Sequence, residues 1–149
     1  MKIVVVDYGI GNIQSIFNAL SQFKGFEIIL SDNRKEILSS DGLILPGVGA
    51  FKNAMDELSL RGLPSILSDY ILQKKPFLGI CLGMQLLFES SEELGHTKGL
   101  GFIKGHVEAF PKDVEDKLPH VSWNSVDIQE DIGNKSIFKN VKNGDDFYF

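Results

Sequence analysis

The sequence has little of several features that place a protein in a specialised class. It contains one cysteine, so no disulfide can close within the chain. It has no long uncharged apolar run and no signal-like N-terminus, which predicts a cytoplasmic protein. The formal net charge is −5 and the Lys and Arg residues are not clustered, whereas nucleic acids and anionic membranes bind clustered positive charge. The expected partners are therefore small molecules and other proteins.

Metal-ligand spacing is also missing. The three histidines, His96, His106 and His120, are scattered singly through the second half of the chain, and none pairs with the cysteine at a ligand spacing. We therefore expect no metal and no cofactor.

The apolar residues of the first half alternate between strand-like and helical spacing. Short apolar runs predict strands at residues 2–6, 26–30, 42–45 and 77–80, of which the first and the last are expected to be buried. Spacings of three and four predict helices from residue 13 to about residue 25, at 50–60 and at 63–73, and the polar stretch 31–40 has room for a short helix. This alternation predicts an α/β fold: an open, mostly parallel sheet with helices on both faces and ligand sites beyond the carboxyl ends of the strands.

The second half of the chain has a different texture. Strand-like segments separated by turns occur at residues 102–110, 121–128 and 147–149, which predicts a β-rich C-terminal part. A chain of 149 residues with 43% hydrophobic content is long enough to bury one ordinary core, so we expect one domain.

Residues 79–83, Gly79-Ile80-Cys81-Leu82-Gly83, have the pattern of a nucleophile elbow in which cysteine replaces serine. The nucleophile of such an elbow has a strained backbone, and a side chain at either flanking glycine would crowd the turn or the approaching substrate. A position at the start of a helix would also favour the thiolate. The pattern predicts Cys81 as a thiol nucleophile, although a free cysteine is also commonly a small core residue. Gln85 stands one helical turn further on, on the same face, where its amide is suited to holding a substrate.

Attack on an amide places negative charge on its oxygen, and each N–H donor aimed at that charge is worth roughly 3 to 4 kcal/mol. Residues 46–49, Pro46-Gly47-Val48-Gly49, follow the third predicted strand and so belong at the same sheet edge as Cys81. Their glycines permit unusual dihedral angles and a peptide flip. We expect this segment, called here the oxyanion loop, to supply the donors. Taken alone, it would also suit a plain turn.

Four motifs together resemble those of a known family. They are Asp7-Tyr8-Gly9-Ile10-Gly11-Asn12, the oxyanion loop, the elbow continued through Met84 and Gln85, and Pro119-His120-Val121-Ser122-Trp123-Asn124. They occur in the family's order and cover almost the whole chain. On these motifs the sequence resembles the class I (triad) glutamine amidotransferases, which have a flavodoxin-like fold, and more narrowly the glutaminase subunits of imidazole glycerol phosphate synthase.

The resemblance implies that Cys81 forms a glutamyl thioester and that the ammonia released passes to a partner subunit. It implies two sets of site residues: Gly47, Val48, Gly49, Gln85 and Glu93 at the glutamine, and Tyr8, Asn12, Trp123 and Asn124 on or near the partner face. The implied partner is a (β/α)₈-barrel cyclase, HisF-like, in a heterodimer that makes imidazole glycerol phosphate for histidine biosynthesis. For Trp123, a core position is the physical alternative.

The thiol mechanism also needs an acid/base group, usually a histidine held by a carboxylate. The family places this histidine just beyond the strand that matches residues 146–149, with a glutamate two residues later. We therefore expect residues 1–149 to be one glutamine amidotransferase domain truncated before the dyad, inactive as given, with none of the three histidines acting as the base.

Three alternatives stay open. Val121-Ser122 stands where the histidine-pathway subunits usually have Met-Gly, so the same chemistry can instead supply ammonia to a surface-sugar amidotransferase. A non-catalytic scaffold would have kept the fold without the dyad. A thiol hydrolase or peptidase of related fold would have a similar elbow.

Overall fold

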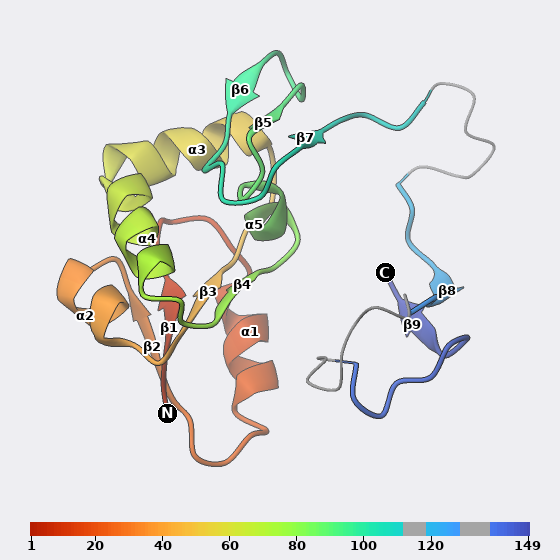
Figure 1. The fold of residues 1–149 in the computed structure, drawn as a ribbon, viewed down its shortest axis with the longest axis horizontal. Coiled ribbons are helices and arrows are strands. Elements are labelled where there is room, and N and C mark those ends of the chain that lie inside the picture. The colour runs from red at the N-terminus through yellow and green to blue at the C-terminus, as the bar shows by residue number, and fades with distance from the viewer. Residues whose placement is uncertain (112–118, 129–137) are drawn as a thin grey trace. The chain divides into compact units, whose positions relative to one another are not determined.

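A computed structural model describes residues 1–111, 119–128 and 138–149 of the chain. Its contacts divide the chain into two compact units, Met1–Ala109 and Phe110–Phe149. Each unit is described by itself below, and Figure 1 shows the course of the chain through both. In the described residues, no helix combines the length and the apolar character that crossing a membrane requires.

The first unit is built on a four-stranded parallel sheet. Its strands are β1 (Lys2–Val6), β2 (Glu27–Ser31), β3 (Gly42–Leu45) and β4 (Phe77–Gly79), in the spatial order β2-β1-β3-β4. All three strand pairs are parallel. The predicted strands are confirmed, and the predicted mostly parallel sheet with them.

Helices connect these strands, as the sequence predicts. They are α1 (Ile13–Leu20), α2 (Arg34–Ser39), α3 (Phe51–Leu60), α4 (Leu63–Leu72) and the single turn α5 (Leu82–Gln85). The helix predicted to run to about residue 25 ends earlier, at Leu20. Two short-range bonds, from the N–H groups of Gln22 and Phe23 to the carbonyls three residues back, form a tight turn there. Gly25 then takes a positive φ of 93°.

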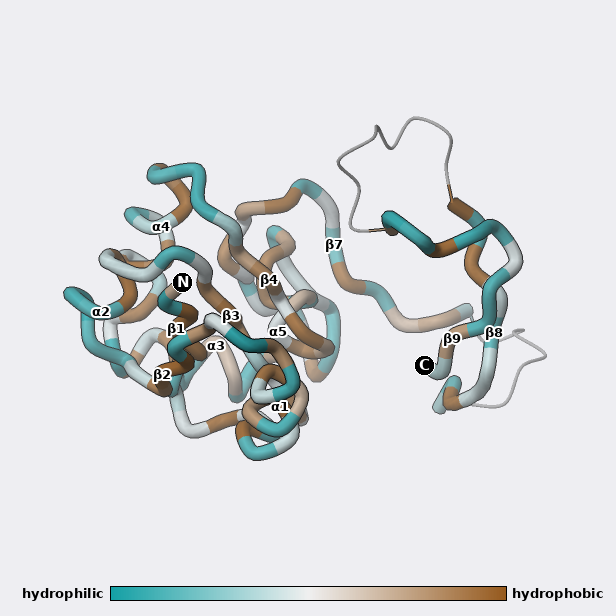
Figure 2. Tube along the Cα trace, turned by 90° about the horizontal axis from the view of Figure 1, so that it is seen from below, coloured by the Kyte–Doolittle hydropathy of each residue, from teal (hydrophilic) through white to brown (hydrophobic). Residues whose placement is uncertain are grey.

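The core lies mainly on one face of the sheet. Val4, Val6 and Leu45 point to this face, where they pack with buried side chains of α2, α3 and α4. Val5, at the intervening position, is also buried but points to the opposite face. Figures 1 and 2 show α2 and α4 on one side of the sheet and α1 on the other. No residue of α1 is fully buried, so helices lie on both faces but cover them unequally.

The prediction that the fourth strand is buried is wrong. β4 pairs only with β3 and forms one edge of the sheet in the described residues, and Leu78 is 54% exposed. An apolar run indicates a buried strand when sheet neighbours and helices cover it, and an edge position removes part of that cover. The edge matters here because β4 leads directly into Cys81.

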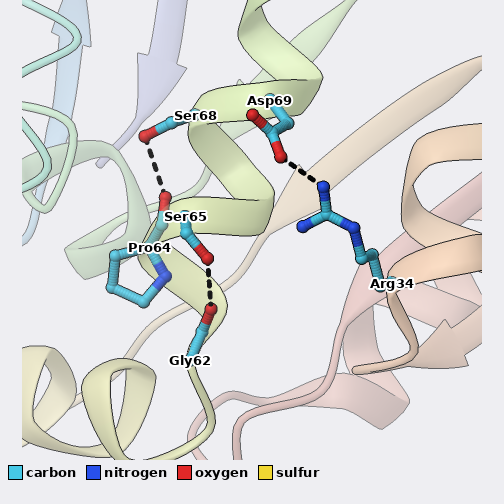
Figure 3. A network of polar contacts seen from close by, with 6 residues as sticks. All are labelled: Arg34, Gly62, Pro64, Ser65, Ser68 and Asp69. Atoms are coloured by element: carbon cyan, nitrogen blue, oxygen red, sulfur yellow. Dashed lines mark hydrogen bonds and ion pairs between the residues drawn. The ribbon is translucent and has the colours of Figure 1, made fainter.

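Polar contacts hold α2 against α4 at the surface. Arg34 near the start of α2 forms an ion pair with Asp69 of α4, and both side chains are about half exposed. Within α4, Ser65 donates to the carbonyl of Gly62 and Ser68 to that of Pro64 (Figure 3). Of these contacts, the Arg34–Asp69 ion pair joins α2 to α4, the helix that precedes β4.

The remaining strands are short. In the first unit, β5 (Ser90–Ser91), β6 (Thr97–Lys98) and β7 (His106–Val107) form a small sheet in the order β6-β5-β7. In the second unit, β8 (Trp123–Ser125) pairs antiparallel with β9 (Asp146–Tyr148). Each of the three strand-like segments predicted in the second half of the chain contains a strand, β7, β8 or β9, but these strands have only two or three residues, so the described residues are less β-rich than expected.

Candidate active site

Cys81 lies where β4 ends and α5 begins. Its backbone has φ 54° and ψ −121°, a region that L-residues adopt only under strain. The thiol belongs to an exposed residue, so the alternative of a small core cysteine is wrong. The strained, exposed elbow that the sequence predicts is therefore present.

The two glycines that flank Cys81 leave room for no side chain. A Cβ at Gly79 would lie 2.6 Å from Met84 Cα, and a Cβ at Gly83 would lie 2.0 Å from the carbonyl oxygen of Leu45. Both neighbours are backbone atoms that cannot rotate aside. The turn can close only with glycine at these positions, which explains the spacing of the motif.

The helix that follows the nucleophile is a single turn. α5 has four residues, and a helix dipole grows with the number of aligned peptide groups. The predicted stabilisation of a thiolate by this helix end therefore rests on a single turn. Cys81 also closes that turn, since its carbonyl accepts from the N–H groups of Met84 and Gln85.

The oxyanion loop lies directly against the elbow. A Cβ at Gly47 would lie 2.6 Å from the backbone nitrogen of Gly83, so the two backbones touch. In the described residues, no acceptor bonds the N–H groups of Gly47, Val48 or Gly49. Gly49 has a φ of 86° with open space around its Cα. The loop therefore brings unpaired donors next to the nucleophile, which a plain turn does not require.

The resemblance places Tyr8 on or near the partner face, and the structure shows what this side chain contacts within the first unit. Its side chain is fully buried, so it cannot itself contact a partner. Its hydroxyl donates a 2.6 Å hydrogen bond to the carbonyl oxygen of Pro46, and burial raises the pKa of Tyr8 to about 12. The side chain instead connects the end of β1 to the start of the oxyanion loop.

Gln85 and Glu93 line one cavity of about 270 Å³ in the first unit, together with Ser91, Glu92, Val107, Glu108 and Ala109. Cys81 is not among the lining residues, although the N–H of Gln85 donates a hydrogen bond to the carbonyl oxygen of Cys81. The Glu93 carboxylate already has a partner, since its Oε2 accepts from the N–H of Phe51 at 2.7 Å. It thereby caps the N-terminus of α3, whose own N-cap residue provides no side-chain bond.

The other residues assigned to the partner face are accessible. Asn12 is exposed and caps α1 by accepting from the N–H of Ser15. In the second unit, Trp123 is 67% exposed and packs edge to face against the ring of Tyr148, so the core alternative is wrong for this residue. Asn124 is half-buried, and its amide lies 2.8 Å from Nε2 of His120.

Each histidine has a polar partner other than the nucleophile. His96 Nδ1 lies 2.8 Å from Glu92 Oε1, and His106 Nδ1 lies 2.7 Å from the hydroxyl of Ser90. His120 contacts Asn124 as described above. Within the first unit, no described contact joins His96 or His106 to Cys81. Over residues 1–111, 119–128 and 138–149, no group of three or more His, Cys, Asp or Glu side chains is arranged to hold a metal ion.

Comparison with known proteins assigns the class. The family model of class I glutamine amidotransferases matches residues 4–144, and the chain belongs to this family. The resemblance inferred from the four motifs is confirmed.

The individual relatives are more specific. The chain is 47% identical to the HisH 2 subunit of imidazole glycerol phosphate synthase from Vibrio vulnificus (strain YJ016), covering 100% of this chain and 69% of the relative. It is 50% identical to the HisH subunit from Listeria monocytogenes serotype 4b (strain CLIP80459), covering 85% and 61%. With the HisH subunit from Caldanaerobacter subterraneus subsp. tengcongensis it shares 46% identity, covering 97% and 68%. The chain thus spans between 61% and 69% of the length of these relatives.

Proposed function

We propose that the complete protein is the glutaminase subunit of imidazole glycerol phosphate synthase. It hydrolyses glutamine to glutamate and ammonia and passes the ammonia to a (β/α)₈-barrel, HisF-like cyclase in histidine biosynthesis. The observation that carries this proposal is the backbone contact between Gly47 and Gly83. This contact puts a loop with unpaired N–H groups beside an exposed cysteine with strained backbone. The names of the relatives support the same pathway.

The chemistry follows from this juxtaposition. The Cys81 sulfur attacks the side-chain amide carbon of glutamine, and the carbonyl electron pair moves onto oxygen. The N–H groups of Gly47, Val48 and Gly49 donate hydrogen bonds to this negatively charged oxygen. The C–N bond then breaks, ammonia leaves after protonation, and a glutamyl thioester remains on Cys81. Water attacks the thioester, which releases glutamate and restores the thiol.

Gln85 and Glu93 are the proposed substrate-binding side chains. Both line the same cavity, and a carboxylate there suits the α-ammonium group of glutamine. Only one oxygen of Glu93 is used by the N–H of Phe51. The second oxygen is available to a ligand, so Glu93 can bind substrate and cap α3 together.

We propose that none of the three histidines of this chain is the acid/base group that the mechanism needs. The three histidines have polar partners in Glu92, Ser90 and Asn124, and within the first unit neither His96 nor His106 has a described contact with Cys81. A polypeptide of these 149 residues alone is therefore expected to turn over no glutamine.

We also propose, from the family resemblance, that Asn12 of the first unit and Trp123 and Asn124 of the second unit contact the partner subunit. An exposed tryptophan that packs on a second aromatic ring is the kind of anchor that dominates binding energy at interfaces. Small-molecule biosynthesis with a protein partner fits a cytoplasmic location, which we also propose.

The test is a glutaminase assay of the complete protein with and without the co-expressed barrel subunit. We expect ammonia release that depends on the partner and disappears in Cys81→Ala. Activation by a sugar-modifying partner instead of the cyclase would show that the protein supplies ammonia to a surface-sugar amidotransferase. No alkylation of Cys81 by a chloroketone analogue of glutamine in the assembled complex would identify a scaffold, and partner-independent hydrolysis of other acyl substrates would identify a thiol hydrolase.

A further inference from the structure

The carbonyl oxygen of Pro46 is held by one side chain. Tyr8 donates to it from a fully buried position at 2.6 Å, and in the described residues no other group donates to this oxygen. Pro46 is the first residue of the oxyanion loop. Its carbonyl is therefore fixed by a phenol from the end of β1 rather than by the sheet.

A peptide group is planar, so the direction of its C=O bond sets the direction of the N–H bond on its other side. The carbonyl of Pro46 and the N–H of Gly47 belong to one such group. Gly47 has no side chain that could hold this plane by packing, and glycine rotates more freely than other residues. The Tyr8 hydroxyl thereby limits the orientation of the Gly47 N–H, the first donor of the loop.

A second buried tyrosine has a similar bond with a different consequence. Tyr70 is fully buried and donates to the carbonyl oxygen of Pro76 at 3.1 Å. That oxygen also accepts from the N–H of Leu43 at 3.0 Å, and it lies at the amino end of β4, away from Cys81. Loss of the Tyr70 hydroxyl would leave the Pro76 carbonyl held, whereas loss of the Tyr8 hydroxyl would release the Pro46 carbonyl.

We propose that Tyr8 is a positioning residue for the oxyanion loop, which acts by holding the Pro46–Gly47 peptide group in the orientation that stabilises the tetrahedral oxygen. This inference rests on the proposed glutaminase function. Tyr8 is fully buried and no described contact joins it to Cys81, so we expect its contribution to appear in the transition state and not in ground-state binding of glutamine.

The test compares wild type, Tyr8→Phe and Tyr70→Phe in the complete protein with its barrel partner. Each variant removes one buried hydroxyl and keeps the ring. We expect Tyr8→Phe to lower kcat and kcat/KM together by about tenfold with KM nearly unchanged, the signature of an interaction made only in the transition state. Tyr70→Phe should keep kcat. Thermal melting of each variant establishes that it is folded at the assay temperature.

Three outcomes separate the claims. Inactive wild-type complex would refute the proposed function itself. Active wild type with equal kcat in both variants would overturn the role of Tyr8 and leave the function intact. A Tyr8→Phe protein that is unfolded at the assay temperature would also count against the proposal, because the hydroxyl would then support the fold and not the loop.

Discussion

The close packing of the nucleophile elbow against the end of β3 is best tested at Gly83, which lies against the backbone of Leu45. This residue lies in α5 with helical backbone, so alanine there adds no conformational strain. Its Cβ would, however, lie 2.0 Å from the carbonyl oxygen of Leu45 and 2.9 Å from the carbonyl carbon of Pro46. Gly83→Ala therefore isolates crowding between the elbow and the start of the oxyanion loop.

The size of the effect follows from the distances. Real Cβ atoms essentially never lie closer than 3.0 Å to such neighbours, so one backbone must move by about 1 Å. Overpacking costs about 1 to 3 kcal/mol when side chains can adjust, and here only backbone lies opposite, so we expect about 3 kcal/mol of lost stability. A displacement of about 1 Å next to reacting groups costs roughly 100-fold in rate.

The matched control is Gly62→Ala. Gly62 has a φ of 66° and open space around it, so alanine there meets strain of about 1 to 2 kcal/mol without crowding. Urea unfolding followed by circular dichroism gives both free energies, and partner-dependent glutaminase activity gives the rates. If Gly83→Ala were as stable and as active as Gly62→Ala, the close packing inferred for the elbow would be refuted.

Three further predictions concern strain, pH and surface charge. Cys81→Gly should be more stable than Cys81→Ala by about 1 to 3 kcal/mol in urea unfolding, because glycine relieves the positive φ of 54°; equal stability would show that the elbow stores no strain. Burial raises the pKa of Tyr8 from 10.0 to about 12, so its contribution to stability is complete below pH 10 and is lost as the pH rises through 12. Burial also raises the pKa of Tyr70, which therefore contributes to stability in the same direction. Tyr8→Phe should consequently reduce, but not abolish, the loss of stability at alkaline pH, measured as melting temperature over a pH series. Arg34→Ala should cost less than about 1 kcal/mol, with little further change in high salt, since the ion pair with Asp69 is 52% and 44% exposed; a larger loss would mean that the pair in Figure 3 organises the packing of α2 on α4.

Much of the sheet could be predicted from the sequence. The predicted bounds of β1 and β3 agree with the structure, because each is a dense apolar run closed by residues that begin a turn. The elbow was also predictable, since steric exclusion at Gly79 and Gly83 appears directly as glycine in the sequence. Sequence patterns therefore predicted the structure correctly where the residues of one short segment determine the geometry of that segment.

The rest depends on contacts between distant segments, which local patterns do not contain. An edge position exposes Leu78 although its strand is as apolar as a buried one. The bond from Tyr8 to Pro46 spans 38 positions, and the bond between Glu93 and Phe51 spans 42. A tyrosine directly after a buried strand was the one available signal, because a buried phenol needs an acceptor, but the sequence does not show which acceptor it finds.

These two long-range bonds hold the oxyanion loop from both sides. Tyr8 fixes the carbonyl of Pro46 at its start, and Glu93 fixes the N–H of Phe51 just after its end. Between these anchors, Gly47 has no room for a side chain, whereas Gly49 has open space and a positive φ. We therefore expect a peptide flip in this loop to be sterically possible at Gly49 and not at Gly47, so that the first donor of the loop keeps its place beside Cys81.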